Sequence, residues 1–221
     1  PDVPRVDLDH QRELAARALR DRDAGLAQTP EGLAALAASA APGLPDGEFT
    51  LVVQIDAWNI RERDSWGETE ALAAKGEKPE RWHWVYTATV FRLDQRGITA
   101  SGRPVISERG YVATREGLEA FKRQLYAETA RRGLFRAAHV LIIADGAIWI
   151  WNIADDRFKG ATQRVDLYHV KEHLWSLAAE LHGKGTDAAR EWAAPYLDWL
   201  TGRKDGALDV LRGLEGLRDA A

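Results

Sequence analysis

Residues 49–56 read FTLVVQID, an apolar run rich in β-branched residues that ends on Asp56. Residues 139–145 read HVLIIAD, a second run of the same kind that ends on Asp145. Short apolar runs with polar boundaries are typical of buried β-strands. Two such strands, each followed by an aspartate, indicate an α/β domain in which both carboxylates lie at one edge of a sheet.

Further strands are expected between these two runs. The second strand is WHWVYTATVFRL at 82–93, a short strand follows near Ile98, and 105–113 supplies a third. The stretch 58–81 is polar and contains glycine and proline, which predicts an excursion loop.

Helices alternate with strands in the second half of the chain. Thr114 is expected to cap a helix that Gly133 ends, and its inward positions are Leu118, Phe121 and Leu125. After the second apolar run we expect a brief helix at 154–158, a strand at 163–167 and a longer helix. The apolar stripe of that longer helix is expected to pack onto the sheet and consists of Val170, Leu174, Leu177 and Leu181.

The element order from Phe49 is therefore β-β-β-α-β-α-β-α, an antiparallel meander followed by strands reached through helices. This order resembles that of RNase H-like domains, with a mixed sheet whose first and fourth strands are adjacent and parallel. A charged surface helix at 9–26 and a linker at 34–47 precede the sheet. The expected domains are an N-terminal helical segment, 1–48, a core, 49–183, and a helical segment, 184–221.

Asp56 and Asp145 are the first candidate site. If their strands are adjacent and parallel, the two carboxylates lie roughly 4–6 Å apart and a shared divalent cation relieves their repulsion. Oxygen ligands of this kind suit Mg²⁺ or Mn²⁺, which support phosphoryl transfer. The alternative is that each strand simply stops at a polar residue.

The composition limits the classes of protein. The chain has a net charge of −4, which argues mildly against nucleic-acid binding, although residues 115–136 hold six basic side chains against three glutamates. The absence of cysteine excludes disulfides and thiolate metal sites. No apolar run reaches the roughly 18 residues that a membrane span needs. Most of the nine tryptophans are expected to pack in the core or in interfaces, with base stacking as the alternative.

Residues 169–173, HVKEH, match the H-x-x-E-H pattern of zinc peptidases, with His169 and His173 as ligands and Glu172 as the base. Three fixed letters in five make a weak match, and a polar helix flank with ordinary histidines is the favoured interpretation. We expect His169 to make a local hydrogen bond and to hold no zinc.

Residues 143–174, IADGAIWIWNIADDRFKGATQRVDLYHVKEHL, resemble the second-aspartate block of bacterial insertion-sequence transposases of the ISKra type, relatives of the Mutator-like group. The shared features are Asp-Gly-Ala-x-Trp-Ile after a strand, a Phe-x-Gly-Ala turn, and Val-Asp-x-Tyr-His before a helix. Residues 52–58, VVQIDAW, are similar to the first-aspartate strand of that family. The resemblance covers roughly residues 50–183, and the helical tail resembles the start of that family's all-helical insertion.

This resemblance implies a DDE transposase core that cleaves DNA and transfers strands at transposon ends. Asp56 and Asp145 would be the first two catalytic carboxylates and would hold Mg²⁺ or Mn²⁺. Asp166 and His169 match the family's Asp/Cys-x-x-His signature. The implied partners are transposon-end and target DNA, with a homodimer or higher assembly on DNA and no membrane. The implied location is the bacterial cytoplasm, at the nucleoid when DNA is bound.

The family's third acid is a glutamate in a Gly-Ser-Gly-x-x-Glu-Ser-like segment, and the 221 residues contain no such segment. We expect the native chain to continue past Ala221 into it, and this chain alone to be inactive. Glu180, 35 positions after Asp145, is the one internal substitute. The first alternative is a truncated or domesticated transposase that acts as a non-catalytic DNA-binding or assembly module. The lesser alternative is the zinc peptidase.

Overall fold

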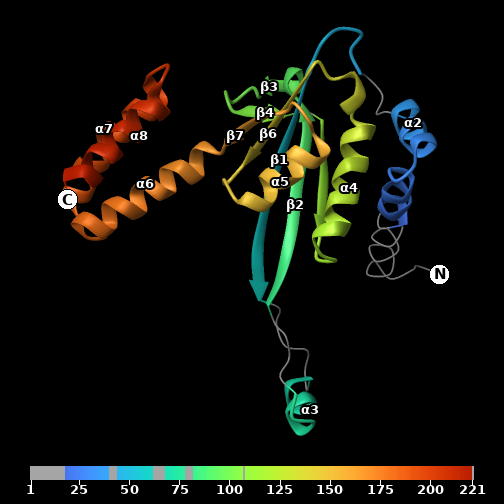
Figure 1. Cartoon of the computed structure of the whole chain (residues 1–221), viewed down its shortest axis with the longest axis horizontal. Coiled ribbons are helices and arrows are strands. Elements are labelled where there is room, and N and C mark those ends of the chain that lie inside the picture. The colour runs from blue at the N-terminus through green and yellow to red at the C-terminus, as the bar shows by residue number, and fades with distance from the viewer. Residues whose placement is uncertain (1–17, 40–43, 62–67, 78–81, 107, 221) are drawn as a thin grey trace. The chain divides into compact units, whose positions relative to one another are not determined.

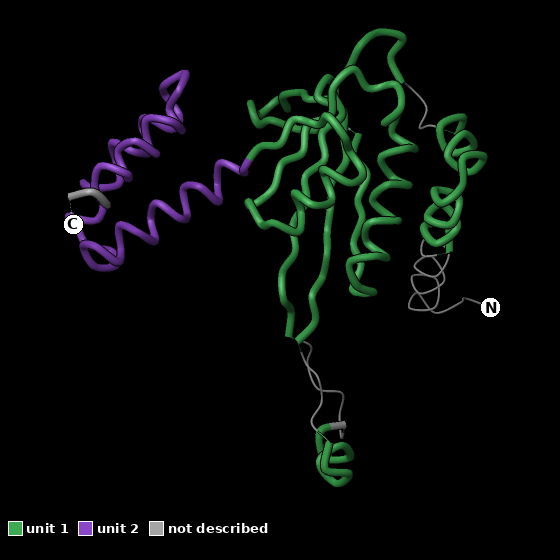
Figure 2. The backbone as a smooth tube through the Cα atoms, in the orientation of Figure 1, with its two compact units in different colours: residues 1–164 green, residues 165–221 purple. Residues whose placement is uncertain are grey.

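The computed structural model describes residues 18–39, 44–61, 68–77, 82–106 and 108–220 (Figure 1). The chain forms two compact units, residues 1–164 and residues 165–221 (Figure 2). The first unit is built on a β-sheet, and the second is helical apart from the end of one strand. The expected domain bounds at residues 48 and 183 stay a prediction.

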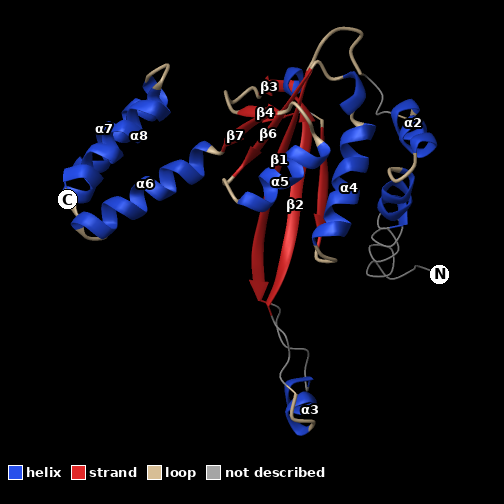
Figure 3. Ribbon diagram, in the orientation of Figure 1, coloured by secondary structure: helices blue, strands red, loops and turns tan. Residues whose placement is uncertain are grey.

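Five strands form the sheet of the first unit, in the order β5-β2-β1-β6-β7 (Figure 3). Strand β1 pairs antiparallel with β2 and parallel with β6, and β2 pairs antiparallel with β5. The chain is therefore α/β, with a mixed sheet and flanking helices. The predicted parallel pairing of the two aspartate-bearing strands is confirmed. The bounds are β1 (Thr50–Arg61), β2 (Trp82–Arg92), β5 (Arg109–Thr114), β6 (His139–Ala144) and β7 (Thr162–Val165).

The predicted strands near Ile98 and at 105–113 are only partly correct. Strands β3 (Arg96–Ile98) and β4 (Pro104–Ile106) pair with each other in a separate two-stranded sheet. Only β5 joins the main sheet as the third strand of the meander. The turn between β3 and β4 includes Gly102, whose φ of 78° favours glycine and allows the tight reversal.

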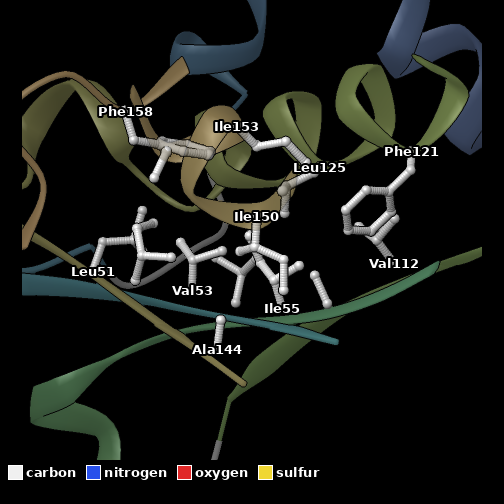
Figure 4. Close-up of a cluster of buried hydrophobic side chains, with 14 of the residues drawn as sticks. Leu51, Val53, Ile55, Val112, Phe121, Leu125, Ala144, Ile150, Ile153 and Phe158 are labelled. Carbon is white, nitrogen blue, oxygen red and sulfur yellow. The ribbon is translucent and has the colours of Figure 1, made fainter. Parts of the chain in front are cut away.

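The hydrophobic core lies on one face of the main sheet, under α4 (Leu118–Arg131) and α5 (Ile148–Arg157) (Figure 4). Alternate residues of β1 point into it, as period-2 geometry requires. Phe121 and Leu125 of α4 are fully buried, as predicted. The other buried members that Figure 4 labels are Leu51, Val53, Ile55, Val112, Ala144, Ile150, Ile153 and Phe158.

Three element boundaries differ from the prediction. The predicted excursion loop at 58–81 is wrong in two places. Strand β1 continues to Arg61, and the helix α3 (Glu68–Ala74) lies within the predicted loop. Helix α4 begins at Leu118 with Gly117 as its N-cap, while the Thr114 hydroxyl accepts a hydrogen bond from the Glu116 N–H. Helix α5 begins well before the predicted residue 154, directly after the turn that follows β6.

The N-terminal helices pack against α4. Residues 18–26 are helical, and α2 (Pro30–Ala38) buries Leu36 against α4, so the expected linker at 34–47 begins too early. Asp23 is almost fully buried and pairs with Arg131 of α4, which a simple surface helix would not require. Burial raises the pKa of Glu128, which also pairs with Arg131. The helix at 18–26 is thus joined to α4 by the ion pair of Asp23 with Arg131, and α2 by the packing of Leu36.

The second unit consists of α6 (Leu167–His182), α7 (Asp187–Gly202) and α8 (Gly206–Ala220). Leu174 packs against Tyr196 of α7 and Val210 of α8, whereas we expected its stripe to cover the sheet. Leu181 of the same stripe is more than half exposed, which also departs from that expectation. Among the described residues, no helix is both long and apolar enough to cross a membrane.

Candidate metal site on the central strands

The register of the parallel pair brings Asp56 and Asp145 to the same level. Strands β1 and β6 pair one residue for one, from Thr50 with His139 to Gln54 with Ile143. Continued by two residues, this register sets Asp56 beside Asp145. Paired strands lie about 4.8 Å apart, and we expect a similar approach at Asp56 and Asp145, just past the end of β6.

Asp56 belongs to the sheet face opposite the core. Ile55 and Ala144 point into the core beneath α4 and α5. Successive side chains of a strand alternate between faces, so Asp56, one residue after Ile55 within β1, points to the other face. Asp145 lies in the turn directly after β6, and we expect its carboxylate on the same side as Asp56. Both residues are partly buried. The 4–6 Å separation of the carboxylates stays a prediction.

A tight turn after β6 orients Asp145. Its Oδ1 accepts a hydrogen bond from the Ala147 N–H at 2.8 Å, an Asx-type turn that leads directly into α5. Gly146 between them has a φ of 103°, a conformation that residues with a Cβ rarely adopt. The sequence Asp-Gly-Ala therefore holds the carboxylate at the strand end while the chain reverses.

Asp56 lies inside β1, which corrects the expectation that its strand ends there. Its Oδ1 accepts a hydrogen bond from the Ala57 N–H at 2.7 Å. Its main-chain oxygen accepts a hydrogen bond from the Thr87 hydroxyl of β2 at 3.2 Å. Asp56 is thus fixed by the centre of the sheet, whereas Asp145 is fixed by a turn.

Neither aspartate pairs with a cation in the part of the chain that the structure describes. Two neighbouring carboxylates without a basic partner repel each other, and a divalent cation with oxygen preference offsets that repulsion. The two residues therefore fit Mg²⁺ or Mn²⁺. Across the described ranges, however, no group of three His, Cys, Asp or Glu side chains could hold a metal.

The remaining predicted site residues lie on or just before α6 in the second unit. Asp166 is the N-cap of α6, and its Oδ1 accepts a hydrogen bond from the Tyr168 N–H at 2.7 Å. His169 Nδ1 lies 3.4 Å from Glu172 Oε2, a local contact between residues of HVKEH. His173 and Glu180 are exposed on the same helix. None of the four is brought into a three-residue metal group.

We expect Asp166→Ala to destabilise α6 by about 1 kcal/mol, because the first turn loses its capping oxygen. Asp166→Asn should keep the stability, since asparagine caps equally well. The free energy of unfolding, measured by urea denaturation followed by circular dichroism, checks this. Equal losses for the two variants would show that the charge, and not the cap, is what α6 needs.

The basic segment 115–136 does not form a free positive face. Arg131 pairs with Asp23, Arg132 Nε lies 2.6 Å from Glu128 Oε1, and Lys122 Nζ lies 2.7 Å from Glu119 Oε1. Arg136 donates a hydrogen bond to the main-chain oxygen of Pro45. Most of these charges are therefore used within the chain.

One residue beside the site was not singled out from the sequence. Trp58 was assigned to the excursion loop, yet it lies on β1 two residues after Asp56 and is 49% exposed. Residues 56–61 mix polar and apolar side chains without a regular alternation, so the sequence gave no burial signal for a strand. The signal that the sequence did offer was a tryptophan two residues after an expected catalytic carboxylate.

No family model matches the chain, and neither the curated proteins nor the solved structures give a match. The geometry of Asp56 and Asp145 and the sequence resemblance are thus the two sources for a functional proposal.

Proposed function

We propose that the chain carries the catalytic core of a bacterial DDE transposase of the ISKra type, with an RNase H-like fold. Asp56 and Asp145 bind Mg²⁺ or Mn²⁺, and the protein cuts DNA at transposon ends and joins the freed strand to target DNA. The observation that carries the proposal is the parallel β1–β6 register, whose continuation by two residues would bring Asp56 beside Asp145.

Two further features support this proposal. The order of strands and helices is the one expected of an RNase H-like domain, with the first and fourth strands of the main sheet adjacent and parallel. Residues 143–174 also resemble the second-aspartate block of the family, and Asp145 occupies the position of its carboxylate.

The proposed chemistry divides between a bound cation and the two aspartates that would hold it. A bound divalent cation supplies charge stabilisation and lowers the pKa of an attacking water. Asp56, fixed within the central strand, and Asp145, fixed by the Asx-type turn, would hold the cation with their carboxylate oxygens. Such preorganisation reduces the reorganisation needed when phosphate charge develops.

A second candidate function is a non-catalytic DNA-binding or assembly module. The observation in its favour is that no three His, Cys, Asp or Glu side chains among the described residues come together to hold a metal. In-line phosphoryl transfer with two cations needs further oxygen ligands. Glu180, the internal substitute, lies on α6 in the second unit.

The metal site can be tested by replacing Mg²⁺ with Fe²⁺ and adding ascorbate and peroxide, which cuts the polypeptide near the bound iron. We expect cuts close to Asp56 and Asp145, since both would contact one ion. Asp56→Asn and Asp145→Asn should each reduce the cuts at both positions. Asp155→Asn, on the exposed surface of α5, is the matched control and should leave them unchanged.

Mass spectrometry of the fragments gives the cut positions. Cuts around His169 and His173 in place of the two aspartates would favour the zinc alternative. Absence of specific cuts at millimolar Fe²⁺ would remove the metal from the proposal and leave the non-catalytic module.

A further inference from the structure

Strands β1 and β2 continue as a two-stranded ribbon beyond their neighbours. Strand β5 ends at Thr114, which pairs with Tyr86, and β6 ends at Ala144, level with Ile55 in the continued register. From there residues 57–61 and 82–85 pair only with each other within the main sheet that the structure describes. Among the described residues, no further strand of the main sheet pairs with either edge of this ribbon.

Exposed tryptophans occupy both faces of the ribbon. Trp58 pairs with Val85, whereas Trp84 pairs with the next residue of β1, Asn59, so the two indoles point to opposite faces. Trp58 is 49% exposed and Trp84 is 54% exposed. Each face of the ribbon therefore presents an exposed indole that an aromatic ligand can cover.

Trp58 shares the face of the two aspartates. It lies two residues after Asp56 on the same strand, a spacing of about 7 Å along the strand direction. Side chains two residues apart point to the same side, so its indole lies on the side of Asp56 and of the metal site that we propose there. Trp84 is on the core side of the sheet, together with Tyr86 and Ala88.

The chemistry of the ribbon fits a nucleic-acid strand. Residues 57–61 and 82–87 include Arg61 and His83 and contain no aspartate or glutamate, although the whole chain has more acidic than basic residues. Trp58 makes no hydrogen bond or ring contact with any described residue. Every nucleobase has a π-face that an indole can cover, whatever the sequence.

We propose that Trp58 stacks on an unpaired base of a DNA strand whose phosphate lies at Asp56 and Asp145. The inference rests on the proposed function, because it takes its phosphate position from the metal site. Trp58 is then a positioning residue: it fixes the base next to the reacting phosphate, and a single strand or an opened end is held more tightly than a closed duplex.

The test is equilibrium binding of the full chain to fluorescein-labelled oligothymidylate, measured by anisotropy with Ca²⁺ in place of Mg²⁺. Trp58→Ala should weaken binding roughly 5- to 100-fold, the range for loss of one base-stacking ring. Trp58→Phe should keep most of the affinity, because phenylalanine still offers a ring. Trp84→Ala, an equally exposed tryptophan on the opposite face, should change it less than about twofold.

Three results would overturn the inference. The first is equal losses for Trp58→Ala and Trp84→Ala, which would indicate a general aromatic surface. The second is unchanged binding by Trp58→Ala, or no binding by the unaltered chain. The third is a change of sedimentation coefficient in Trp58→Ala without DNA, which would show that a second copy of the chain covers the ring.

Failure of the proposed function gives a different pattern. If Asp56→Asn and Asp145→Asn leave the Fe²⁺ cuts unchanged while Trp58→Ala still weakens oligothymidylate binding, the strand-binding surface stands and the metal site does not. If the cuts depend on both aspartates while Trp58→Ala binds oligothymidylate normally, the metal site stands and the strand-binding surface does not.

Discussion

Asp145→Ala and Asp56→Ala should each lower metal-dependent strand cleavage by roughly a thousandfold or more, since the loss of one carboxylate removes several kcal/mol of charge stabilisation. The assay follows nicking of labelled transposon-end DNA with Mg²⁺ or Mn²⁺. It uses a polypeptide in which residues 1–221 are followed by a Gly-Ser-Gly-x-x-Glu-Ser-like segment, because the proposed reaction needs a third acid. Residues 1–221 alone should fold and leave the DNA intact.

Glu180→Gln serves as the matched control for this prediction. Its carboxylate is exposed on α6, and we expect its loss to change the cleavage rate less than about threefold. Cleavage by residues 1–221 alone that disappears on Glu180→Gln would contradict the prediction and identify Glu180 as the third acid. Unchanged cleavage in Asp56→Ala and Asp145→Ala would reject both aspartates as catalytic residues.

Phe121→Ala should destabilise the first unit by about 3–5 kcal/mol, the usual cost of removing a fully buried phenylalanine. The Phe121 ring is 0% exposed and lies 5.7 Å from the Tyr86 ring and 6.3 Å from the Trp149 ring, centroid to centroid. Its loss leaves a cavity between α4, α5 and the sheet. Because a typical domain is stable by only about 5–15 kcal/mol, this variant should be close to unfolding.

Phe135→Ala is the control, because Phe135 also contacts one aromatic ring, that of Tyr126, but is 50% exposed. We expect it to cost less than about 1 kcal/mol. Urea denaturation followed by near-ultraviolet circular dichroism, which reports on the packed aromatic rings, measures both changes. Similar losses of unfolding free energy for the two variants would show that the burial of Phe121 does not stabilise the first unit more than the half-exposed Phe135 does.

The sequence predicted those parts of the fold that local patterns encode. The apolar runs before Asp56 and Asp145 are strands, as predicted. Leu51, Val52 and Val53 of β1 are buried on both faces of the sheet, whereas β6 buries Ile142 and Ala144 on one face. The inward positions of α4 followed from helical spacing. The parallel pairing of the two strands followed from the element order.

Features that depend on distant contacts were not predicted. The extension of β1 to Arg61 depends on pairing with β2, and its mixed polar sequence gives no burial signal. The early start of α5 was hidden because Ile148–Trp151 is rich in residues that favour strands. The burial of Asp23 requires Arg131, which no local pattern connects to it.

The sequence predicted the two aspartates of the candidate site but not the residues around them. The expectation that the two aspartates lie side by side follows from the strand register, and two apolar runs of similar length already suggest it. The Trp58 ring was assigned to a loop, because only the observed strand gives it a face. A residue's neighbours across a sheet are set by pairing, which a single sequence does not contain.

The one-for-one ladder between β1 and β6 makes these two segments intolerant of changes in length. A single residue inserted between Thr50 and Asp56 would move the Asp56 side chain to the face of α4 and α5, where a carboxylate finds only apolar neighbours. An insertion of two residues would restore the face but displace the carboxylate by about 7 Å along the strand. Descendants of this chain can therefore exchange side chains along the two strands far more easily than they can gain or lose residues in them.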